Sequence, residues 1–355
     1  MKKQRKLIAF GIAVLLLLGL GAGCAQKETA SVPAQDATNG SIDETIAEYP
    51  ETTLDIPPKA FGEPTDDGGN MDLSLEMVPL AASPAMFTLE MPSAPGTLTK
   101  ANNKATIDYS NSAKGYIMVK YASSTTKELR VLVTGPSGVQ YQYSLKKNAT
   151  YDTYPLSDGN GKYSIGVYEQ VEGSKYATAI SATIEVKLEN EFAPFLFPNQ
   201  YVNFTDKSAV VAKAADLVKN AKNLTEKISS VYTYVISNLT YDKELAANVK
   251  SGYLPDVDAV MARGKGICFD YAAVMTAMLR SQGIPTRLVI GYAGTVYHAW
   301  IDVYSETEGW INNVIFFDGE SWKLMDPTFA STGNQSASIM QYIGTGSNYS
   351  ARFIY

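Results

Sequence analysis

The pattern of hydrophobic and polar positions changes near residue 200. Between residues 100 and about 190, short stretches of strand composition alternate with turn sequences such as Gly135-Pro136-Ser137-Gly138. In the last stretch every second residue is apolar, which puts one face in the core and the other in water. This spacing predicts an all-β, immunoglobulin-like antiparallel sandwich, with strands at 114–121, 128–134, 139–145, 162–169 and 178–188.

From about residue 208 the apolar positions follow a helical period instead. We expect one helix over about 208–221, a second from about 225, and a third from Cys268 to the Gly283 and Pro285 pair. Strand-like segments follow, at 286–292, at 298–304, and in a hairpin around Asp318-Gly319. Helices followed by antiparallel strands are typical of an α+β domain.

The chain is therefore expected to be multidomain. We assign residues 1–24 to a signal peptide, 25–85 to a disordered acidic linker, 86–190 to the β-sandwich module and 191–355 to the α+β domain. An aromatic- and proline-rich stretch at 190–207 is expected to join the two folded parts and to contact both.

Charge is distributed unevenly along the chain. Residues 25–100 contain 13 acidic and three basic residues, whereas residues 101–355 contain 23 of each. Low hydrophobicity with many acidic residues favours a solvated spacer. The folded part has no excess of basic residues, so we expect no nucleic acid partner.

The N-terminus has the pattern of an export signal. Lys2, Lys3, Arg5 and Lys6 precede an apolar run that ends in Leu-Gly-Ala-Gly-Cys at Cys24. That ending resembles the lipobox of bacterial lipoproteins, although Gly21 stands where the family usually has Leu. The resemblance implies that Cys24 is the lipid attachment site and that the body lies on the extracytoplasmic side of the cell membrane. An ordinary signal peptide or an uncleaved anchor is the alternative.

Candidate chemistry centres on the only histidine, His298, and the only cysteine outside the leader, Cys268. A thiol needs a base to become a useful nucleophile near neutral pH, and imidazole is suited to that task. Cys268 is expected to open a helix, where unpaired N–H groups and the helix dipole lower the pKa of a thiol. Asp326 follows the last predicted strand and could orient the imidazole. The alternative is a buried structural cysteine beside an incidental histidine.

Three motifs together resemble the transglutaminase-like superfamily, which has a papain-like cysteine fold. They are Gly266-Ile267-Cys268, His298-Ala299-Trp300 and Asp326-Pro327-Thr328, and the resemblance covers about residues 205–335. It implies that Cys268 attacks an amide carbonyl, that His298 transfers protons and that Asp326 orients His298. A thioester would form and then pass to water or to an amine.

Other site residues are expected around this triad. Gly266 leaves room for substrate next to Cys268, Tyr241 is a candidate lining residue, and Trp300 is either a substrate-binding or a core residue. We find no calcium-loop pattern and too few histidines and cysteines for a zinc site, so no metal or other cofactor is expected.

The first interpretation is thus a surface enzyme that cleaves or cross-links amide bonds of peptides or proteins. Cell-wall peptides are one candidate substrate class. The second is a non-catalytic binding or assembly scaffold with the same fold. The third is an acyltransferase with a thioester donor, which an exported protein would rarely meet.

Overall fold

The computed structural model describes residues 46–48, 87–293, 296–306, 309–311, 314–317, 322–324 and 349–355. Residues 44–355 belong to one compact unit; the other unit, 1–43, contains no described residue. The predicted leader, Cys24 and Asp326 therefore lie outside the described residues.

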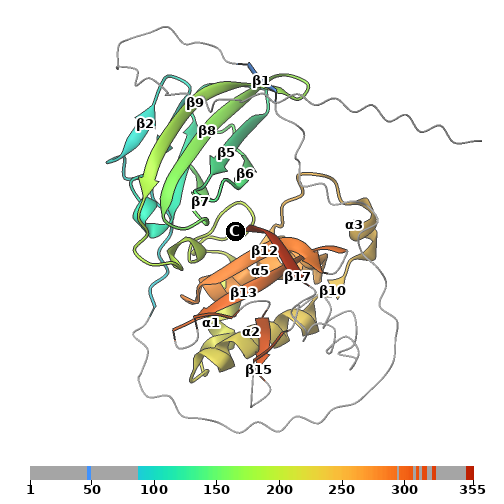
Figure 1. The fold of residues 1–355 in the computed structure, drawn as a ribbon. Helices are drawn as coiled ribbons and strands as arrows, with labels where there is room; N and C mark the ends of the chain where they lie inside the picture. Colours follow the sequence, from blue (N-terminus) through green and yellow to red (C-terminus); the bar gives the residue numbers. More distant parts are fainter. Residues whose placement is uncertain are drawn as a thin grey trace, which may run out of the picture. The chain divides into compact units, whose positions relative to one another are not determined.

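The first part of the fold consists of two antiparallel sheets (Figure 1). One has the strand order β1-β9-β8-β5-β6, and the other has the order β2-β3-β4-β7. The strands are β1 (Ile46–Glu48), β2 (Thr99–Ala101), β3 (Ala105–Asp108), β4 (Tyr116–Tyr121), β5 (Leu129–Thr134), β6 (Gln140–Ser144), β7 (Asp152–Pro155), β8 (Gly161–Glu172) and β9 (Lys175–Val186).

All five strands predicted in this region are present, as β4, β5, β6, β8 and β9. Strands β2, β3 and β7 were not predicted. Strand β1 lies inside the segment expected to be a disordered linker, and it pairs with β9 through Ile46 opposite Ala177. The linker expectation therefore differs from the structure at these three positions.

The two sheets share one hydrophobic core. In β9 the alternation is as predicted, with Ile180, Ile184 and Val186 buried and the residues between them exposed or partly exposed. Buried residues of the second sheet, such as Ile107 and Val119, belong to the same cluster. The region is therefore rich in β-sheet, and its immunoglobulin-like classification stays a prediction, as does a domain boundary at residue 190.

The second part is an α/β region in which the predicted helices are confirmed as α1 (Ala209–Val218), α2 (Leu224–Asn238) and α5 (Cys268–Arg280). Two short helices, α3 (Lys243–Asn248) and α4 (Val257–Arg263), were not predicted. A sheet has the order β14-β13-β12-β17, while β10 pairs with β11 and β15 with β16. These strands are β10 (Thr240–Tyr241), β11 (Lys265–Gly266), β12 (Thr286–Ala293), β13 (Val296–Ser305), β14 (Gly309–Ile311), β15 (Val314–Phe317), β16 (Trp322–Leu324) and β17 (Tyr349–Ile354).

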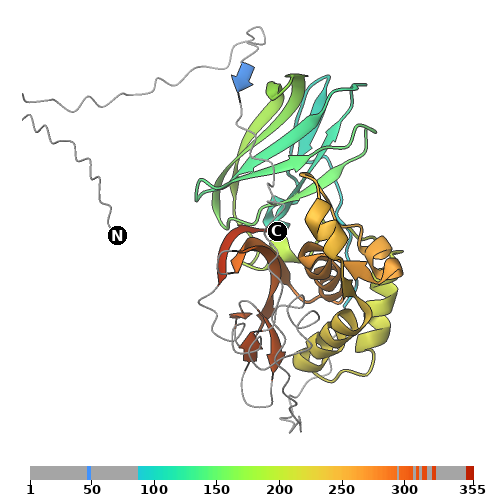
Figure 2. The ribbon, with the colours of Figure 1, turned by 90° about the vertical axis from the view of Figure 1, so that its right-hand side faces the viewer.

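Helix α5 lies at the centre of this region. Helices α1, α2 and α4 pack on it, and it also packs on strands β12 and β13 (Figures 1 and 2). All of its residues are buried. A helix in that position needs side chains that suit a core on every face, and its sequence Cys-Phe-Asp-Tyr-Ala-Ala-Val-Met-Thr-Ala-Met-Leu-Arg has few polar residues.

The segment at 190–207 contacts both parts, as predicted. The Phe197 ring lies 4.6 Å from that of Tyr116 in β4, and the Tyr201 ring lies 5.8 Å from that of Phe269 in α5. The junction is therefore a packed connection between the sheets and the helix that carries Cys268.

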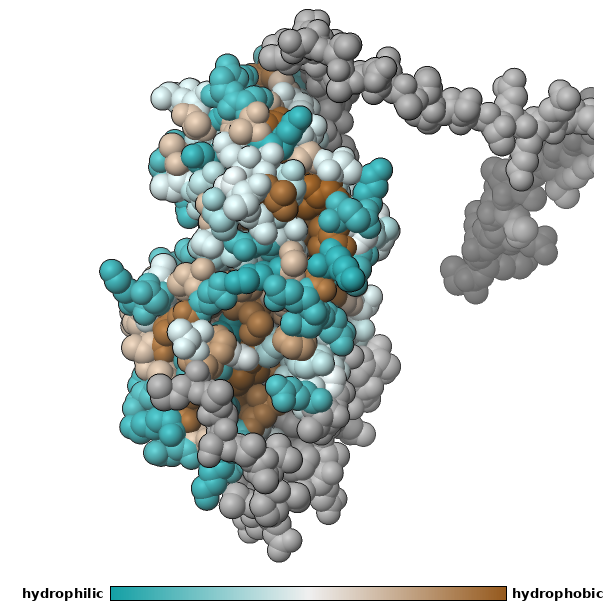
Figure 3. Space-filling view, turned by 90° about the vertical axis from the view of Figure 1, so that its left-hand side faces the viewer, coloured by the Kyte–Doolittle hydropathy of each residue, from teal (hydrophilic) through white to brown (hydrophobic). Residues whose placement is uncertain are grey.

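Large exposed hydrophobic side chains are few and scattered in the described part of the chain. They lie on different segments, and on the face drawn in Figure 3 hydrophobic residues form small patches among hydrophilic ones. No described helix is both long and apolar enough to cross a membrane. The large hydrophobic residues that are exposed are Phe87, Leu98, Val139, Val171, Leu254 and Tyr292.

Arg280, the last residue of α5, is completely buried. Its guanidinium donates hydrogen bonds to three backbone oxygens, those of Thr286 at 2.8 Å, Phe197 at 2.6 Å and Tyr355 at 2.7 Å. Burial lowers the pKa of Arg280 to about 9. The side chain thus joins the end of α5 to the junction, to strand β12 and to the residue after β17.

We expect Arg280→Met to lower the free energy of unfolding by at least about 3 kcal/mol, because three buried oxygens lose their donor. Urea unfolding at neutral pH measures this. Arg130→Met is the matched control, since Arg130 is partly exposed and 3.9 Å from Glu128. An equal, small loss in both variants would contradict a central role for Arg280.

Candidate active site

Cys268 is the first residue of α5, as the sequence predicted, and it is 3% exposed. Helix α4 ends at Arg263 and is followed by Gly264, whose φ of +60° is the left-handed conformation that glycine adopts readily. Only three residues, Lys265 to Ile267, then separate Gly264 from Cys268. The connection between α4 and the thiol-bearing residue is therefore short.

One side of this connection is held by β10. Tyr241 pairs with Gly266 in a parallel bridge, and the N–H of Asp242 donates to the Gly266 oxygen at 2.8 Å. The structure thus brings together Tyr241 and Gly266, two of the predicted substrate-binding positions, next to Cys268. Their role toward substrate stays a prediction.

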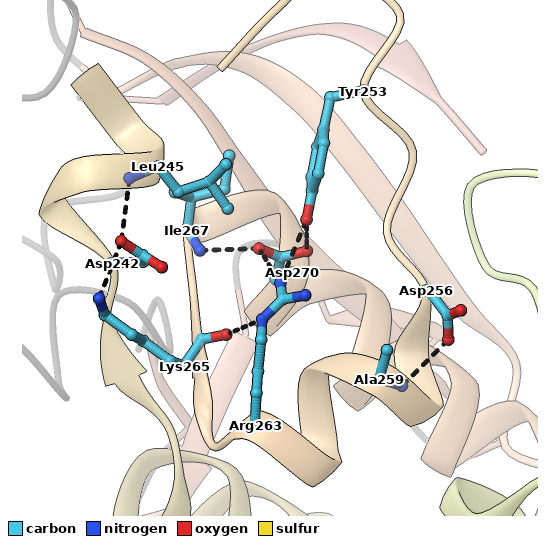
Figure 4. Close-up of polar contacts among 9 residues, drawn as sticks. All are labelled: Asp242, Leu245, Tyr253, Asp256, Ala259, Arg263, Lys265, Ile267 and Asp270. Atoms are coloured by element: carbon cyan, nitrogen blue, oxygen red, sulfur yellow. Dashed lines mark hydrogen bonds and ion pairs between the residues drawn. The ribbon is translucent and has the colours of Figure 1, made fainter. Parts of the chain in front are cut away.

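The other side of the connection is held by the buried carboxylate of Asp270 (Figure 4). Asp270 accepts the N–H of Ile267 at 2.9 Å and the hydroxyl of Tyr253 at 2.6 Å, and Arg263 lies 3.4 Å away. Arg263 also donates from Nε to the oxygen of Lys265 at 2.6 Å. Three partners, from the segment before α4, from the end of α4 and from the residue before Cys268, therefore meet at one carboxylate, two residues after the thiol.

Opposing influences act on this carboxylate. Burial raises the pKa of Asp270, while the hydrogen bonds from Tyr253 and Ile267 and the charge of Arg263 act in the other direction. Asp242 lies near enough to raise it slightly further. The hydrogen-bond donors thus partly offset the cost of placing an acid inside the protein.

Asp270 also explains why residue 266 is glycine. A Cβ built on Gly266 would lie 2.6 Å from the Cβ of Asp270 and 2.8 Å from its Oδ2. Such contacts are too short for any side chain, and the Asp270 Cβ cannot move without moving the helix. Packing against Asp270 is therefore a structural reason for this glycine, besides the room for substrate that the sequence predicted.

His298 lies in β13, which packs against α5, and it is 3% exposed. In the register of the sheet it stands opposite Gly291 of β12. Burial raises the pKa of Tyr297 to about 12, Arg352 acts in the other direction, and the charges of Tyr292 and Cys268 raise it further. Helix α5, which begins with Cys268, thus packs against the strand that holds His298.

Trp300 is 2% exposed, and its ring lies 5.0 Å from that of Tyr349 in an edge-on arrangement. A Cβ on Gly291 would approach its Cη2 atom to 2.8 Å. Trp300 therefore packs as a core residue does, and its predicted contact with substrate stays a prediction.

Asp326, the predicted third member of the triad, lies outside the described residues, as does Cys24, the predicted lipid attachment site. Within the described ranges, no three His, Cys, Asp or Glu side chains are grouped as a metal site would require.

The sequence alone favours a surface or capping role for Asp270, a polar residue in the first turn of a predicted helix. It does cap α5, but it is buried rather than exposed, and its contacts with Tyr253 and Arg263 were not foreseen. The usual capping signature has Ser or Thr at the N-cap, whereas Ile267 stands there. The available signal in the sequence was an acidic residue two positions after Cys268, in the first turn of the predicted helix.

We expect Gly266→Ala to lower the free energy of unfolding by about 1–3 kcal/mol, because the added methyl overlaps Asp270. Urea unfolding measures the change. Gly138→Ala is a suitable comparison, since its Cβ would meet open space and its φ of +85° makes the strain purely conformational. A Gly266→Ala protein as stable as the parent would show that the contact with Asp270 relaxes freely.

Comparison with known proteins gives one family match. Residues 211–313 match the family model of the transglutaminase-like superfamily. The uncharacterized protein YebA of Bacillus subtilis (strain 168) is 28% identical over 149 residues, which cover 36% of this chain and 20% of YebA. The chain thus aligns with only a fifth of that relative's length.

Solved structures show more distant likeness. The periplasmic domain of TgpA from Pseudomonas aeruginosa bound to ethylmercury has 15% identity and a TM-score of 0.31, covering 69% of this chain and 78% of that one. Red sea bream transglutaminase has 14% identity and a TM-score of 0.28, covering 65% and 53%. Residues 211–313, which lie in the α/β region, are thus similar to the transglutaminase-like superfamily.

Proposed function

We propose that this protein is a cysteine enzyme that cleaves or cross-links amide bonds of peptides or proteins through Cys268, His298 and Asp326. The observation that carries the proposal is the placement of Cys268 at the start of α5, a helix that packs against the strand holding His298, inside the segment that matches the family. The start of a helix favours a thiolate, and a neighbouring imidazole can exchange protons with it.

In the first step the Cys268 thiolate attacks the amide carbonyl carbon. The C–N bond breaks, the imidazolium of His298 gives its proton to the leaving amine, and a thioester remains on Cys268. The main-chain N–H of Cys268, which has no partner four residues earlier in the helix, is the proposed donor to the oxyanion.

In the second step the neutral imidazole of His298 takes a proton from water or from an amine. The activated oxygen or nitrogen attacks the thioester, the C–S bond breaks and the thiolate returns. Water yields an acid and completes hydrolysis, whereas an amine yields a new amide and completes a cross-link. Asp326 is proposed to hold the imidazole in the required tautomer.

We further propose that the enzyme is attached to the cell membrane through a lipid on Cys24 and faces the extracytoplasmic side. The export pattern at the N-terminus and the acidic spacer predicted over 25–85 support this placement. The two antiparallel sheets, proposed as an immunoglobulin-like module, would extend the reach of the enzyme or present its substrate.

The proposal predicts a thiolate at Cys268 that persists at low pH. At about pH 6 an ordinary thiol of pKa ~8.5 is almost wholly protonated and reacts slowly with iodoacetamide. We expect Cys268 to be alkylated readily at that pH in the folded protein. We expect His298→Ala to slow the reaction by about tenfold or more, because the ion pair is lost. Mass spectrometry of the Cys268 peptide gives the rate.

The Cys268→Ser variant measures the background of alkylation at other sites. Circular dichroism checks that each variant is folded. A thiol that reacts only at high pH, or only after unfolding, would refute the enzyme and favour the non-catalytic scaffold. An unchanged rate in His298→Ala would remove His298 from the proposed site.

A further inference from the structure

The carboxylate of Asp270 lies at the point where the chain enters α5, and the proposed mechanism assigns it no part. It is completely buried and yet has charged and polar partners from the segment before α4, from the end of α4 and from the residue before Cys268. Figure 4 shows Tyr253, Arg263 and Ile267 converging on it. An acid placed there needs a reason beyond capping, which Ser or Thr at the N-cap would supply without burying a charge.

We propose that Asp270 is a positioning residue for Cys268: it fixes the main chain that enters α5, and with it the placement of the sulfur. The inference rests on the proposed function. Asp270 acts through Ile267, the residue directly before the thiol, and it would not touch the substrate.

The hydrogen bonds explain how one side chain can do this. Oδ2 accepts the N–H of Ile267, and Oδ1 accepts the hydroxyl of Tyr253. The bond from Ile267 holds the residue before the thiol to the first turn of α5, and the bonds from Tyr253 and Arg263 hold that turn to the segment before α4 and to the end of α4. The bridge between Tyr241 and Gly266 fixes the opposite side of the same connection. The main chain that precedes Cys268 is therefore held both by Asp270 and by β10.

The charge of Asp270 by itself disfavours a nearby thiolate, since like charges repel. Arg263 lies 3.4 Å from the carboxylate and offsets part of that charge. The proposed positioning by Asp270 favours the Cys268 thiolate, whereas the negative charge of Asp270 disfavours it. Because the two effects are opposite, variants can separate them. Other charged groups near Asp270 are Asp242 and Lys265, which form their own ion pair at 3.2 Å.

The test compares the iodoacetamide rate of Cys268 at about pH 6 with the rate at about pH 9 in a set of full-length variants. Asp270→Asn removes the charge but keeps an oxygen for the Ile267 N–H, so we expect the ratio of rates to stay within about threefold of the parent or to rise. Asp270→Ala removes the charge and the hydrogen bonds. We expect its ratio to fall about tenfold or more below that of Asp270→Asn.

Tyr253→Phe is the gentler variant if Asp270→Ala does not fold. It removes one hydroxyl outside the helix, and we expect a smaller fall in the same ratio. Asp256→Ala is the matched control. Asp256 caps α4 by accepting the N–H of Ala259 at 3.0 Å, so its loss weakens a helix start without touching the connection to Cys268. We expect this variant to keep the parent ratio.

The outcomes separate this inference from the proposed function. If the parent protein has an ordinary thiol, the proposed function fails whatever the variants do. If the parent has a persistent thiolate and folded Asp270→Ala matches Asp270→Asn, the positioning role is overturned. An equal fall in Asp256→Ala would also overturn it, because general loosening would then explain the effect.

Discussion

Helix α5 has no exposed face, and this constraint governs the rest of the α/β region. A charged side chain on such a helix must find all of its partners inside the protein, because an unpaired buried charge is very costly. Asp270 in the first turn and Arg280 at the last position meet this requirement through different chemistry. Asp270 gathers side-chain and main-chain donors, whereas Arg280 gathers three backbone oxygens. Each also lies at the helix end whose dipole favours its charge.

The two ends of α5 therefore have different tasks. Arg280 connects the helix to the junction, to β12 and to the residue after β17, so it fixes where the helix lies. Asp270 fixes how the chain enters the helix. A nucleophile gains from both, because misplacement by an ångström can abolish much of the benefit of a preorganised site. The proposed chemistry at Cys268 thus depends on polar contacts that lie outside the triad.

Much of the fold could be predicted from periodicity, because the predicted elements are long and regular. Strand β9 alternates over many residues, and the helical period of α5 ends at clear signals, Gly283 and Pro285. The short strands β2, β3 and β7 and the seven-residue helix α4 have too few residues for a period to show. Cys268 and His298 were candidates for the site because each is the sole member of its type after the leader, and their catalytic role stays a prediction.

The contacts of Asp270 and Arg280 could not be predicted in the same way. Asp270 is two positions from Cys268 in sequence, but its partner Tyr253 is 17 residues away and comes from an irregular segment. Arg280 ends a helix, where a basic residue is usually a solvated partner of the dipole. Its burial depends on Phe197 and Tyr355, which are 83 and 75 residues distant. Tertiary contacts of that separation leave no local pattern.

The last strand has a consequence for the order in which the protein assembles. Strand β17 lies beside β12, and the backbone groups of Leu288 and Tyr355 exchange two hydrogen bonds. During synthesis, α5 and β12 emerge long before β17 and Tyr355. Contacts of such long range slow folding, since loop closure comes before any stabilising contact. Until β17 arrives, the guanidinium of Arg280 lacks one of its three acceptors, so this half of the protein is expected to complete its core late.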